Sequence, residues 1–485
     1  MNIKICQIFF TFLLGPIFYF SNPLDGYTLF TPNPPNGSLA ASTYLINNNS
    51  EIINQWLHPS KPASMAYLMK DSTLIYPCLI NNPQMNLAGA GGRIIKYNWE
   101  GTILWDYVWS SHDFLQHHDI EPLPNGNILL LSNERKSYQD AIERGRLNIE
   151  GEIWPDMIVE IEPQGLNGGR IVWEWHFWDH LVQDVDSTKS NYGIIAENPG
   201  KLNINIGSVR GFDPGGNYSG DWMHANSIHY NQKYDQIIIS CRNTNEFYII
   251  DHSTSTFEAS GSTGGNSGKG GDFLYRWGNP QNYDRGDSTD MVTIAQHSVN
   301  WVNEGFPGEN NIIMYNNNYM PSNPEHINRS SILEINPPID SNFNYIIEDE
   351  EPYGPETTEW YYDGGNEFEF LSQAQGGVFR LSNGNTLITS YGDPNIIEVD
   401  TYGNILWSLN FNNTLIHRAQ KYDNDYLQSE IYGDINDDNQ INIIDILILV
   451  NYILVSEDSL TNGDLNDDQF INITDILILI NLIIS

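Results

Sequence analysis

The chain has 485 residues, which is enough for more than one domain and for a large hydrophobic core. Hydrophobic residues make up 40% of it and aromatic residues 12%, so most of the chain is expected to be globular, not disordered. There are 61 acidic residues against 22 basic ones, and the resulting net charge of −39 repels nucleic acid and anionic membrane surfaces. We therefore expect no nucleic-acid partner and no stable membrane insertion.

Residues 1–21 have the pattern of a secretory signal peptide. Lys4 precedes an apolar run from Ile8 to Phe20, which is too short to span a membrane. We expect a secreted, extracellular protein; the periplasm is the alternative compartment, and an uncleaved membrane anchor is the alternative reading of the segment. Removal of the signal leaves Cys78 and Cys241, so at most one disulfide can form and the fold does not depend on a disulfide framework.

From about residue 26 to residue 430 the chain is a succession of short strands with almost no helical periodicity. Two segments, 91–109 and 395–411, share a strand, a polar turn with glycine and then Ile-Leu-Trp. The hairpin LPNGNILLLS at 123–132 returns as LSNGNTLITS at 381–390, and Asn-Gly is the preferred type I′ turn. Small sheets that recur at intervals of roughly 40 to 80 residues predict a β-propeller, with a pair of β-sandwiches as the alternative.

Residues 221–245 read as a strand pair, in which NSIHY meets IIISCR across a polar tip. Side chains alternate along a strand, so we expect His224 to share a face with Asn226 while His229 points the other way. A histidine beside Arg242 would make an anion pocket, because a guanidinium is always charged and its planar fork suits tetrahedral oxyanions. The alternative is a surface histidine and a salt-bridged arginine.

Three further stretches are candidates for the site, two because they contain histidines and one because it repeats a hairpin sequence found earlier in the chain. They are HHDIEPLPNGN at 117–127, AQHSVNW at 295–301 and FLSQAQGGVFRLSNGN at 370–385. Only one of His117 and His118 is expected to face a given side of the strand, because neighbouring side chains alternate.

After residue 430 two closely similar segments follow, GDINDDNQINIIDILILVNYIL from Gly433 and GDLNDDQFINITDILILINLII from Gly463. Each places oxygen atoms at loop positions 1, 3, 5, 7, 9 and 12, a spacing that wraps roughly six or seven oxygens around a hard cation such as Ca²⁺. The expected ligands are Asp434, Asn436, Asp438, the backbone carbonyl of Gln440, Asn442 and Asp445, then Asp464, Asn466, Asp468, the backbone carbonyl of Phe470, Asn472 and Asp475.

This duplicated loop resembles a dockerin domain, the calcium-loop module that docks onto cohesin domains of a scaffold or cell surface. The resemblance implies that residues 431–485 form a small α-helical calcium-loop domain with structural calcium, a cohesin-type protein partner and tethering through it. The sequence departs from the calcium-loop pattern at position 6, where Asn439 and Gln469 stand in place of glycine. Positions 10 and 11, often used for cohesin recognition, are Ile443 with Ile444 and Ile473 with Thr474, so the type of cohesin cannot be carried over.

The larger region resembles the arylsulfate sulfotransferase (arylsulfotransferase) family. The resemblance rests on HHDIEPLPNGN, DWMHANSI, SCRNTN, LYRWGNP and AQHSV in this order, and it covers most of residues 40–415. It implies that residues 26–430 form an all-β, six-bladed β-propeller with its active site at the central channel. By this resemblance the transient sulfo-histidine nucleophile falls on His297, the pocket histidines on His118 (with His117 as the fallback) and His224, and the arginine on Arg242.

The implied reaction moves a sulfuryl group from a phenolic sulfate ester to a phenolic acceptor. Its transition state is loose, with charge on the non-bridging oxygens, so Arg242 and a protonated histidine would stabilise it. A neutral imidazole is nucleophilic near neutral pH, which suits His297. A phenol has a pKa near ~10, so a nearby imidazolium can protonate the leaving phenoxide and later deprotonate the acceptor. This exchange needs neither a catalytic metal nor a nucleotide sulfate donor.

Two alternatives stay open at this point. Three histidines, His118, His224 and His297, would suit a zinc ion that supports hydrolysis, although Arg242 beside them would repel a cation. A non-catalytic propeller that binds sulfated or other glycans on a cohesin-type scaffold is the second alternative, because propellers serve many functions.

Overall fold

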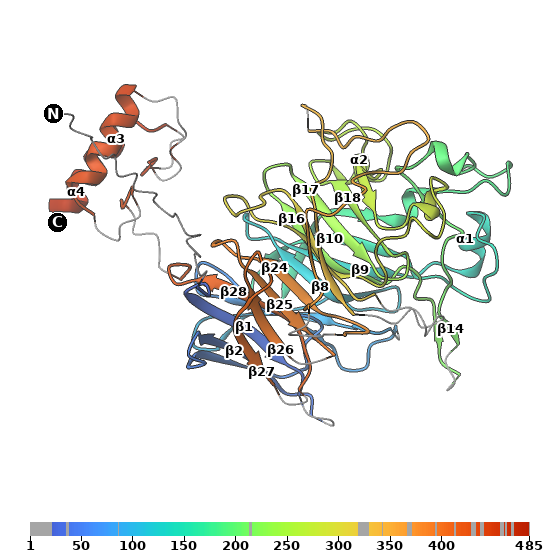
Figure 1. The fold of residues 1–485 in the computed structure, drawn as a ribbon, viewed down its shortest axis with the longest axis horizontal. Helices are drawn as coiled ribbons and strands as arrows, with labels where there is room; N and C mark the ends of the chain where they lie inside the picture. The colour runs from blue at the N-terminus through green and yellow to red at the C-terminus, as the bar shows by residue number, and fades with distance from the viewer. Residues whose placement is uncertain are drawn as a thin grey trace, which may run out of the picture. The chain divides into compact units, whose positions relative to one another are not determined.

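The computed structural model describes residues 22–34, 38–85, 87–212, 216–318, 329–341, 343–365, 371–392, 395–411, 414–427, 433–436, 441–455, 460, 463–466 and 470–484. It divides into two compact units, one of residues up to 68 together with 73–423, and one of residues 69–72 together with those from 424 on. In the first unit the described residues form six four-stranded antiparallel sheets that follow one another along the chain (Figure 1).

The first three sheets, each given from its innermost strand outward, have these bounds. They are β28 (Ile416–Asp423), β1 (Gly26–Pro32), β2 (Ala41–Asn47) and β3 (Ile52–His58); β4 (Tyr67–Leu68), β5 (Leu74–Leu79), β6 (Gly92–Tyr97) and β7 (Ile103–Val108); and β8 (Phe114–Pro122), β9 (Ile128–Glu134), β10 (Asp156–Gln164) and β11 (Gly168–His176).

The other three sheets follow the same order of consecutive strands. They are β16 (Ala225–Asn231), β17 (Gln236–Cys241), β18 (Glu246–Asp251) and β19 (Tyr275–Trp277); β20 (His297–Trp301), β21 (Ile312–Asn316), β22 (Ser331–Ile335) and β23 (Trp360–Tyr362); and β24 (Gly377–Arg380), β25 (Thr386–Ser390), β26 (Asn395–Val399) and β27 (Ile405–Asn410).

Short elements lie in the connections between the third, fourth and fifth sheets. They are α1 (Tyr138–Glu143), η1 (Phe177–Asp179), β12 (Leu181–Val182), η2 (Ile195–Glu197), β13 (Leu202–Asn203), β14 (Gly211–Phe212), β15 (Tyr218–Ser219), α2 (Thr256–Ala259) and η3 (Pro280–Tyr283). Both α-helices begin with a capping box, in which Ser137 and Ser255 accept the backbone N–H of the third helical residue.

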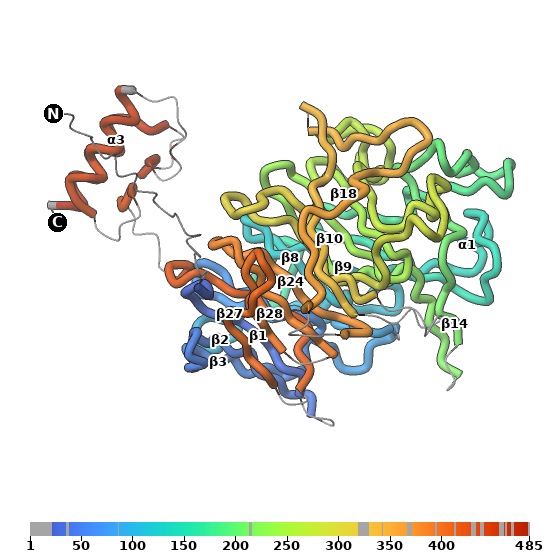
Figure 2. Tube along the Cα trace, in the orientation of Figure 1, coloured from blue at the N-terminus to red at the C-terminus, as the bar shows by residue number. Residues whose placement is uncertain are grey.

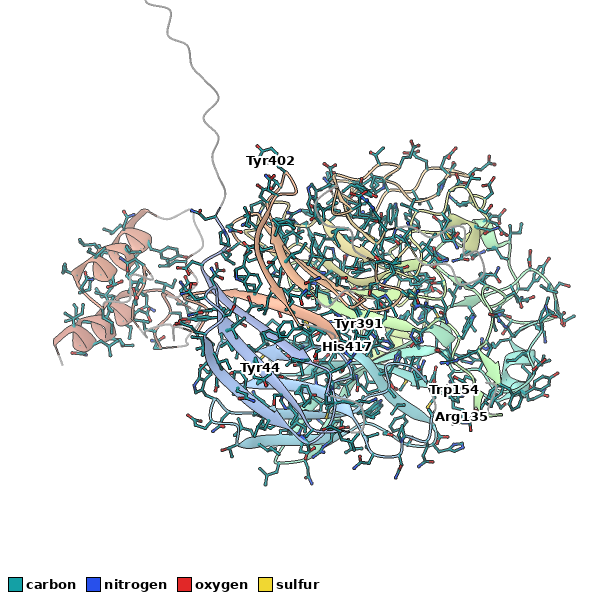
Figure 3. The ribbon with its side chains drawn as sticks, turned by 60° about the horizontal axis from the view of Figure 1, so that its bottom comes forward. Tyr44, Arg135, Trp154, Tyr391, Tyr402 and His417 are labelled. Atoms are coloured by element: carbon teal, nitrogen blue, oxygen red, sulfur yellow. The ribbon has the colours of Figure 1, made fainter. Side chains whose placement is uncertain are left out.

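The ring of sheets is closed by β28, which pairs with β1 although the two strands lie at opposite ends of the unit's sequence (Figure 2). The fully buried Lys421 of β28 donates to Glu398 of the sixth sheet at 2.7 Å, and Glu398 also accepts the backbone N–H of Leu24 at 2.6 Å. On the same seam the rings of Tyr391 and His417 lie 5.4 Å apart (Figure 3). The pairing of β28 with β1 thus closes the ring within the first sheet, and the ion pair and the ring contact join that sheet to the sixth.

The hydrophobic core lies between the faces of neighbouring sheets. Central strands are buried on both faces, so they read as continuous apolar runs such as Leu129–Leu131 in β9 and Ile237–Ile239 in β17. Cys78 and Cys241 are both buried free thiols. The expected six-bladed propeller is therefore confirmed, and two β-sandwiches are not formed.

The second unit contains α3 (Ile443–Val455) and α4 (Ile473–Ile484), which pack on one another through Leu449 and Leu479. Its core also contains Ile435 and Leu465, which stand at the second position of the two loops. This unit is the small C-terminal helical domain that the sequence predicts. Among the residues that the structure describes, no helix is both long and apolar enough to cross a membrane.

Candidate active site

The inner strands of neighbouring sheets bring the predicted histidines together. His118 lies in β8 and His224 directly precedes β16, and their rings meet edge to face with centroids 4.8 Å apart. His297 is the first residue of β20, and the side-chain amide of Asn226 in β16 donates to the carbonyl of the preceding residue, Gln296, at 2.7 Å. Burial, and after it the charge of Arg242, lowers the pKa of His297. The backbone N–H of Arg242 donates to the carbonyl of His224 at 3.1 Å, which places the arginine beside the histidines.

These histidines lie at irregularities of the backbone. The pairing register shifts within β8 between Gln116 and Ile120, and it also shifts at the starts of β16 and β20. His118 has a φ of 50° and His224 a φ of 56°, a left-handed conformation that is unfavourable for residues other than glycine. Such bulges re-aim side chains next to functional sites, and strained backbone is concentrated there.

The bulge in β8 overturns one expectation. Strand alternation was expected to send His117 and His118 to opposite faces, but their Nδ1 atoms lie 3.0 Å apart. The reason is the left-handed backbone of His118, which breaks the alternation that a regular strand would impose. Both histidines are buried, and the Nε2 atom of His117 lies 2.7 Å from the carboxylate of Asp156 in β10.

His224 is held by a carboxylate from its own chain segment. Its Nδ1 atom lies 2.7 Å from Oδ2 of Asp221, and both side chains are buried. Burial by itself would raise the pKa of Asp221, but the charge and the hydrogen bond of His224 hold it below its ordinary value.

His297 is oriented by three groups. Its Nδ1 atom lies 2.7 Å from Oδ1 of Asn317 and 2.9 Å from the backbone carbonyl of Ala295, and its Nε2 atom accepts the backbone N–H of Gln375 at 3.1 Å. An N–H group can only donate, so Nε2 carries the lone pair and Nδ1 the proton. Burial and the nearby charge of Arg242 hold the pKa of His297 well below its usual value. The ring is therefore neutral and nucleophilic.

A buried network joins the remaining inner strands. Asp119 of β8 accepts the hydroxyl of Tyr67 at 2.6 Å and Nη1 of Arg418 at 2.7 Å, and Nη2 of Arg418 donates to the carbonyl of Asn226 at 2.8 Å. Arg418 comes from the closing strand β28 and adds to the positive charge that lowers the pKa values of His118 and His297. Its Nε atom is buried and has no hydrogen-bond partner among the described residues.

Sequence reasoning missed several of these partners. Asp119 directly follows His118 in the string HHD, and Asp221 stands three residues before His224 in the string DWMH. For these two residues the sequence therefore contains a local signal. Asp156, Asn317 and Arg418 come from other strands of the ring and have no local signal.

The two C-terminal loops are built alike. Asp445 accepts the backbone N–H groups of Ile435 and Asn442 at 2.8 Å each, and Asp475 accepts those of Leu465 and Asn472 at the same distances. Asp434, Asp445 and Asp475 are buried, and the oxygen donors are of the kind that Ca²⁺ prefers, so the described residues fit the ion. Three of the expected ligands, Asp438, Gln440 and Asp468, lie outside the described residues. Within the described ranges, no group of three His, Cys, Asp or Glu side chains is placed to hold a metal.

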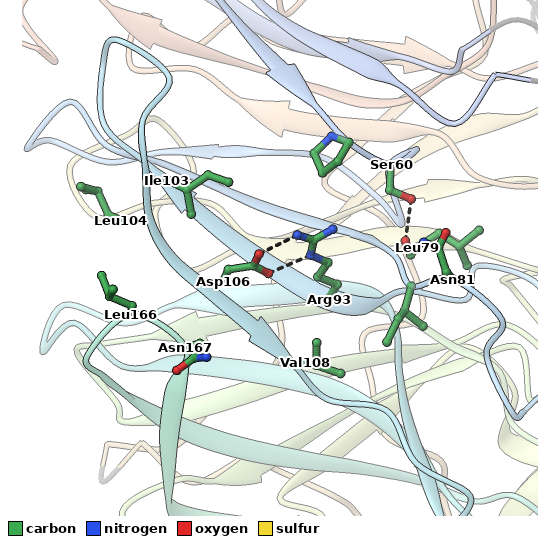
Figure 4. A pocket seen from close by; sticks show the side chains of 12 residues that line it. Ser60, Leu79, Asn81, Arg93, Ile103, Leu104, Asp106, Val108, Leu166 and Asn167 are labelled. Carbon is green, nitrogen blue, oxygen red and sulfur yellow. Dashed lines mark hydrogen bonds and ion pairs between the residues drawn. The ribbon is translucent and has the colours of Figure 1, made fainter.

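A pocket of about 600 Å³ lies elsewhere in the first unit, on the outer strands of the second sheet (Figure 4). Arg93 and Asp106 form a bidentate ion pair in it, and Ile103, Leu104 and Leu166 line its apolar side. None of the histidines or their partners lines this pocket. The candidate site at the histidines is therefore separate from this pocket.

Comparisons with known proteins agree with the division of the chain into a large propeller unit and a small C-terminal unit. A family model described as arylsulfotransferase (ASST) matches residues 56–393, more than half of the 485 residues, and a model of the dockerin type I domain matches residues 432–484. No curated protein matches the chain.

Two solved structures are similar to the chain at low identity. A protein of unknown function from Bacteroides caccae is 11% identical and has a TM-score of 0.43, and the match covers 82% of this chain and 98% of the other. A periplasmic gluconolactonase from Pseudomonas aeruginosa is 9% identical and has a TM-score of 0.38, with 81% and 98% covered. These scores are too low to carry an argument about function.

Proposed function

The chain belongs to the arylsulfotransferase family and carries a dockerin type I domain, and from this premise we propose that it moves a sulfuryl group between phenols through a sulfo-histidine at His297. The observation that carries the proposal is the tautomer of His297, which has its proton on Nδ1 and its lone pair on Nε2. Burial and the charge of Arg242 lower the pKa of this ring. The donor would be a phenolic sulfate ester and the acceptor a phenol.

In the first half-reaction Nε2 of His297 attacks the sulfur, so the N–S bond forms and the S–O bond to the phenol breaks. The attack requires that Nε2 exchange its hydrogen bond from Gln375 for the sulfur atom. The ring becomes positive when Nε2 is substituted, and the carbonyl oxygens of Asn317 and Ala295 stabilise that charge at Nδ1–H. Arg242 faces the charge on the non-bridging sulfate oxygens.

The proton moves through His224. In this proposal His224, whose Nδ1 atom is paired with Asp221, is the acid that gives a proton to the leaving phenoxide. In the second half-reaction the acceptor phenol returns a proton to His224, its oxygen bonds to the sulfur, and the N–S bond breaks. The enzyme ends in its starting protonation state, so no external acid or base is consumed.

The test is a transfer assay with an aryl sulfate and a phenol acceptor in the presence of a chelator. We expect transfer, and we expect the peptide that contains His297 to carry one sulfuryl group when the acceptor is omitted. The variant His297→Ala should lose both signals, whereas His112→Ala, which changes an exposed histidine, should keep them. Tight binding of sulfated ligands without transfer would favour the glycan-binding alternative and overturn the proposal.

The dockerin type I domain supports a second part of the proposal: calcium holds the C-terminal loops, a cohesin-type partner binds the domain, and the protein is secreted and tethered through it. Several apolar side chains of α3 and α4 are exposed within this unit, including Ile443 at 63%, Leu454 at 75% and Ile473 at 68%, and such a surface favours a protein partner. Capture of the full chain by immobilised cohesins with calcium, and its release by chelator, tests this part. A chain that remains in the cell fraction would contradict secretion.

A further inference from the structure

Arg418 reaches across the centre of the ring of sheets. It belongs to β28, the innermost strand of the first sheet, but its Nη1 atom donates to Asp119 of β8 at 2.7 Å and its Nη2 atom to the carbonyl of Asn226 in β16 at 2.8 Å. Asp119 also accepts the hydroxyl of Tyr67, which lies in β4, the innermost strand of the second sheet. Innermost strands surround the central channel of a propeller, so this ion pair joins four sheets at the channel.

The same ion pair adjoins the candidate active site. Asp119 directly follows His118 in the chain. The side-chain amide of Asn226 donates at 2.7 Å to the backbone carbonyl of the residue before His297. Burial contributes most to the low pKa values of His118 and His297, and the charge of Arg418 is a smaller contribution to both. The charge of a second arginine therefore acts on the site.

One edge of this guanidinium is half occupied. In Arg276 and in Arg93, Nε and Nη2 together bond one carboxylate, so these two nitrogen atoms form a single donor edge. In Arg418 the Nη2 atom of that edge donates to Asn226, whereas Nε is buried and has no hydrogen-bond partner among the described residues. A buried donor without an acceptor costs stability, so this edge favours a ligand that brings a negatively charged oxygen.

The place of the guanidinium distinguishes Arg418 from two other buried arginines. Arg146 and Arg380 also have an Nε atom without a partner in the part of the chain that the structure describes. Arg146 donates to backbone carbonyls between residues 204 and 207, and Arg380 bonds Glu334 of β22, a carbonyl in a turn and a hydroxyl of β25. None of these partners lies in an innermost strand, whereas both partners of Arg418 do.

We propose that Arg418 is a second anion-binding residue of the site, and that its Nε–H group donates to a non-bridging oxygen of the sulfuryl group. Three non-bridging oxygens share the negative charge of this group, so Arg242 and Arg418 can bind different oxygens. Asp119 holds the guanidinium by its other side, at Nη1. No bond to Arg418 forms or breaks and no proton leaves it, because a guanidinium stays protonated in proteins. The sulfuryl group as the ligand rests on the proposed function, whereas an anion site at Arg418 does not.

Calorimetric titration of the full chain with inorganic sulfate tests the inference, with chloride at equal ionic strength as the reference. Arg418→Lys keeps a positive charge but has no planar donor edge. We expect sulfate to bind this variant about tenfold more weakly, because one charge-assisted hydrogen bond is lost. The matched control is Arg380→Lys, which changes a buried arginine with the same unpartnered Nε atom and should bind sulfate as the native protein does.

Asp119→Asn should produce a change of the opposite sign. The amide no longer offsets the charge of Arg418, so we expect sulfate to bind several-fold more tightly than to the native protein. Added sulfate should also raise the unfolding temperature of this variant more than that of the native protein. This second variant tests the same anion site even where Arg418→Lys does not fold.

The kinetics of transfer connect the anion site to the reaction. Arg418→Lys should raise the KM of the aryl sulfate and leave the KM of the phenol acceptor nearly unchanged, because a phenol carries no sulfuryl oxygens. The inference is overturned if sulfate does not bind the native protein, if neither Arg418→Lys nor Asp119→Asn changes its affinity, or if Arg380→Lys weakens it equally. If the affinities change as expected but the native protein transfers no sulfuryl group, the proposed function fails while the anion site stands.

Discussion

Asn317 holds His297 in one orientation. Its Oδ1 atom lies 2.7 Å from Nδ1 of the histidine, while its amide donates to the backbone carbonyls of Ser372 and Gln375 at 2.8 Å and 2.7 Å. Those two bonds fix which end of the amide faces the imidazole, so Nδ1 must be the protonated atom. The nucleophilic nitrogen is thus selected by a residue that directly follows the neighbouring strand β21.

The first prediction concerns Asn317→Ala. Without the amide, the imidazole can rotate and lose its preferred tautomer, so we expect the rate of transfer to fall about 10- to 100-fold with little change in the KM of the donor. Asn300→Ala removes another buried amide in β20, which donates to the backbone carbonyls of Ser298 and Val378. Steady-state kinetics should show a loss in the first variant and not in the second; equal losses would contradict the orientation argument.

The second prediction concerns Asp221→Asn. An amide cannot compensate the charge of a protonated His224, so the acid of the first half-reaction is lost and we expect kcat to fall about 10²- to 10⁴-fold. The loss should be smallest for donors with acidic leaving phenols, because they depart without a proton. A series of substituted aryl sulfates measures this; a uniform loss across the series would show that Asp221 does not act through proton transfer.

A third prediction follows from His252, which joins the third and fourth sheets. Burial alone would lower the pKa of this histidine, but hydrogen bonds to Asp235 at 2.7 Å and Glu160 at 3.0 Å raise it to about 9. Because the folded-state pKa lies above the unfolded value, the stabilisation is complete below about pH 6.5 and is lost as the pH rises through about 9.

The test is the variant His252→Gln, compared with the native protein by denaturant unfolding. We expect the native protein to be more stable by about 1 to 3 kcal/mol at pH 6 and the difference to shrink toward zero near pH 10. A difference that stays constant over this range would mean that the charge of His252 does not contribute.

The fourth prediction concerns the closure of the ring. Lys421→Met leaves the buried Glu398 without its cation, and this should lower the free energy of unfolding by about 3 to 5 kcal/mol. The control is Lys233→Met, since Lys233 forms an exposed pair with Glu309 and exposed ion pairs contribute little to stability. Urea unfolding measures both; comparable losses would contradict a special role of the closing pair.

The fifth prediction concerns the calcium loops. If Ca²⁺ holds them, a chelator should expose the amides of α3 and α4 to hydrogen exchange in the full chain, and added Ca²⁺ should restore their protection. Asp445→Ala should remove protection from its own loop and from α3 first, because it also removes the acceptor for the backbone of Ile435 and Asn442. Protection that is indifferent to chelator would contradict the calcium proposal.

The sequence by itself determined the architecture and the types of the reacting groups. The recurring strand-and-turn phrases predict a ring of small sheets because the same local pattern must form the same local sheet, and the duplicated loop predicts a domain of its own. The histidines at 118, 224 and 297 and Arg242 could be selected because each stands in a short motif.

Only the tertiary structure decided how those groups are held. Asp156 and Asn317 contact the histidines, and Arg418 contacts Asp119, from parts of the ring that are distant in the sequence; a hydrogen bond needs its atoms about 3 Å apart, which no local pattern encodes. The bulge at His118 likewise depends on pairing with β9, so strand alternation predicted the wrong relation between His117 and His118. Residue type is written in the sequence, whereas the proton position on each ring is set by the partners that folding brings to it.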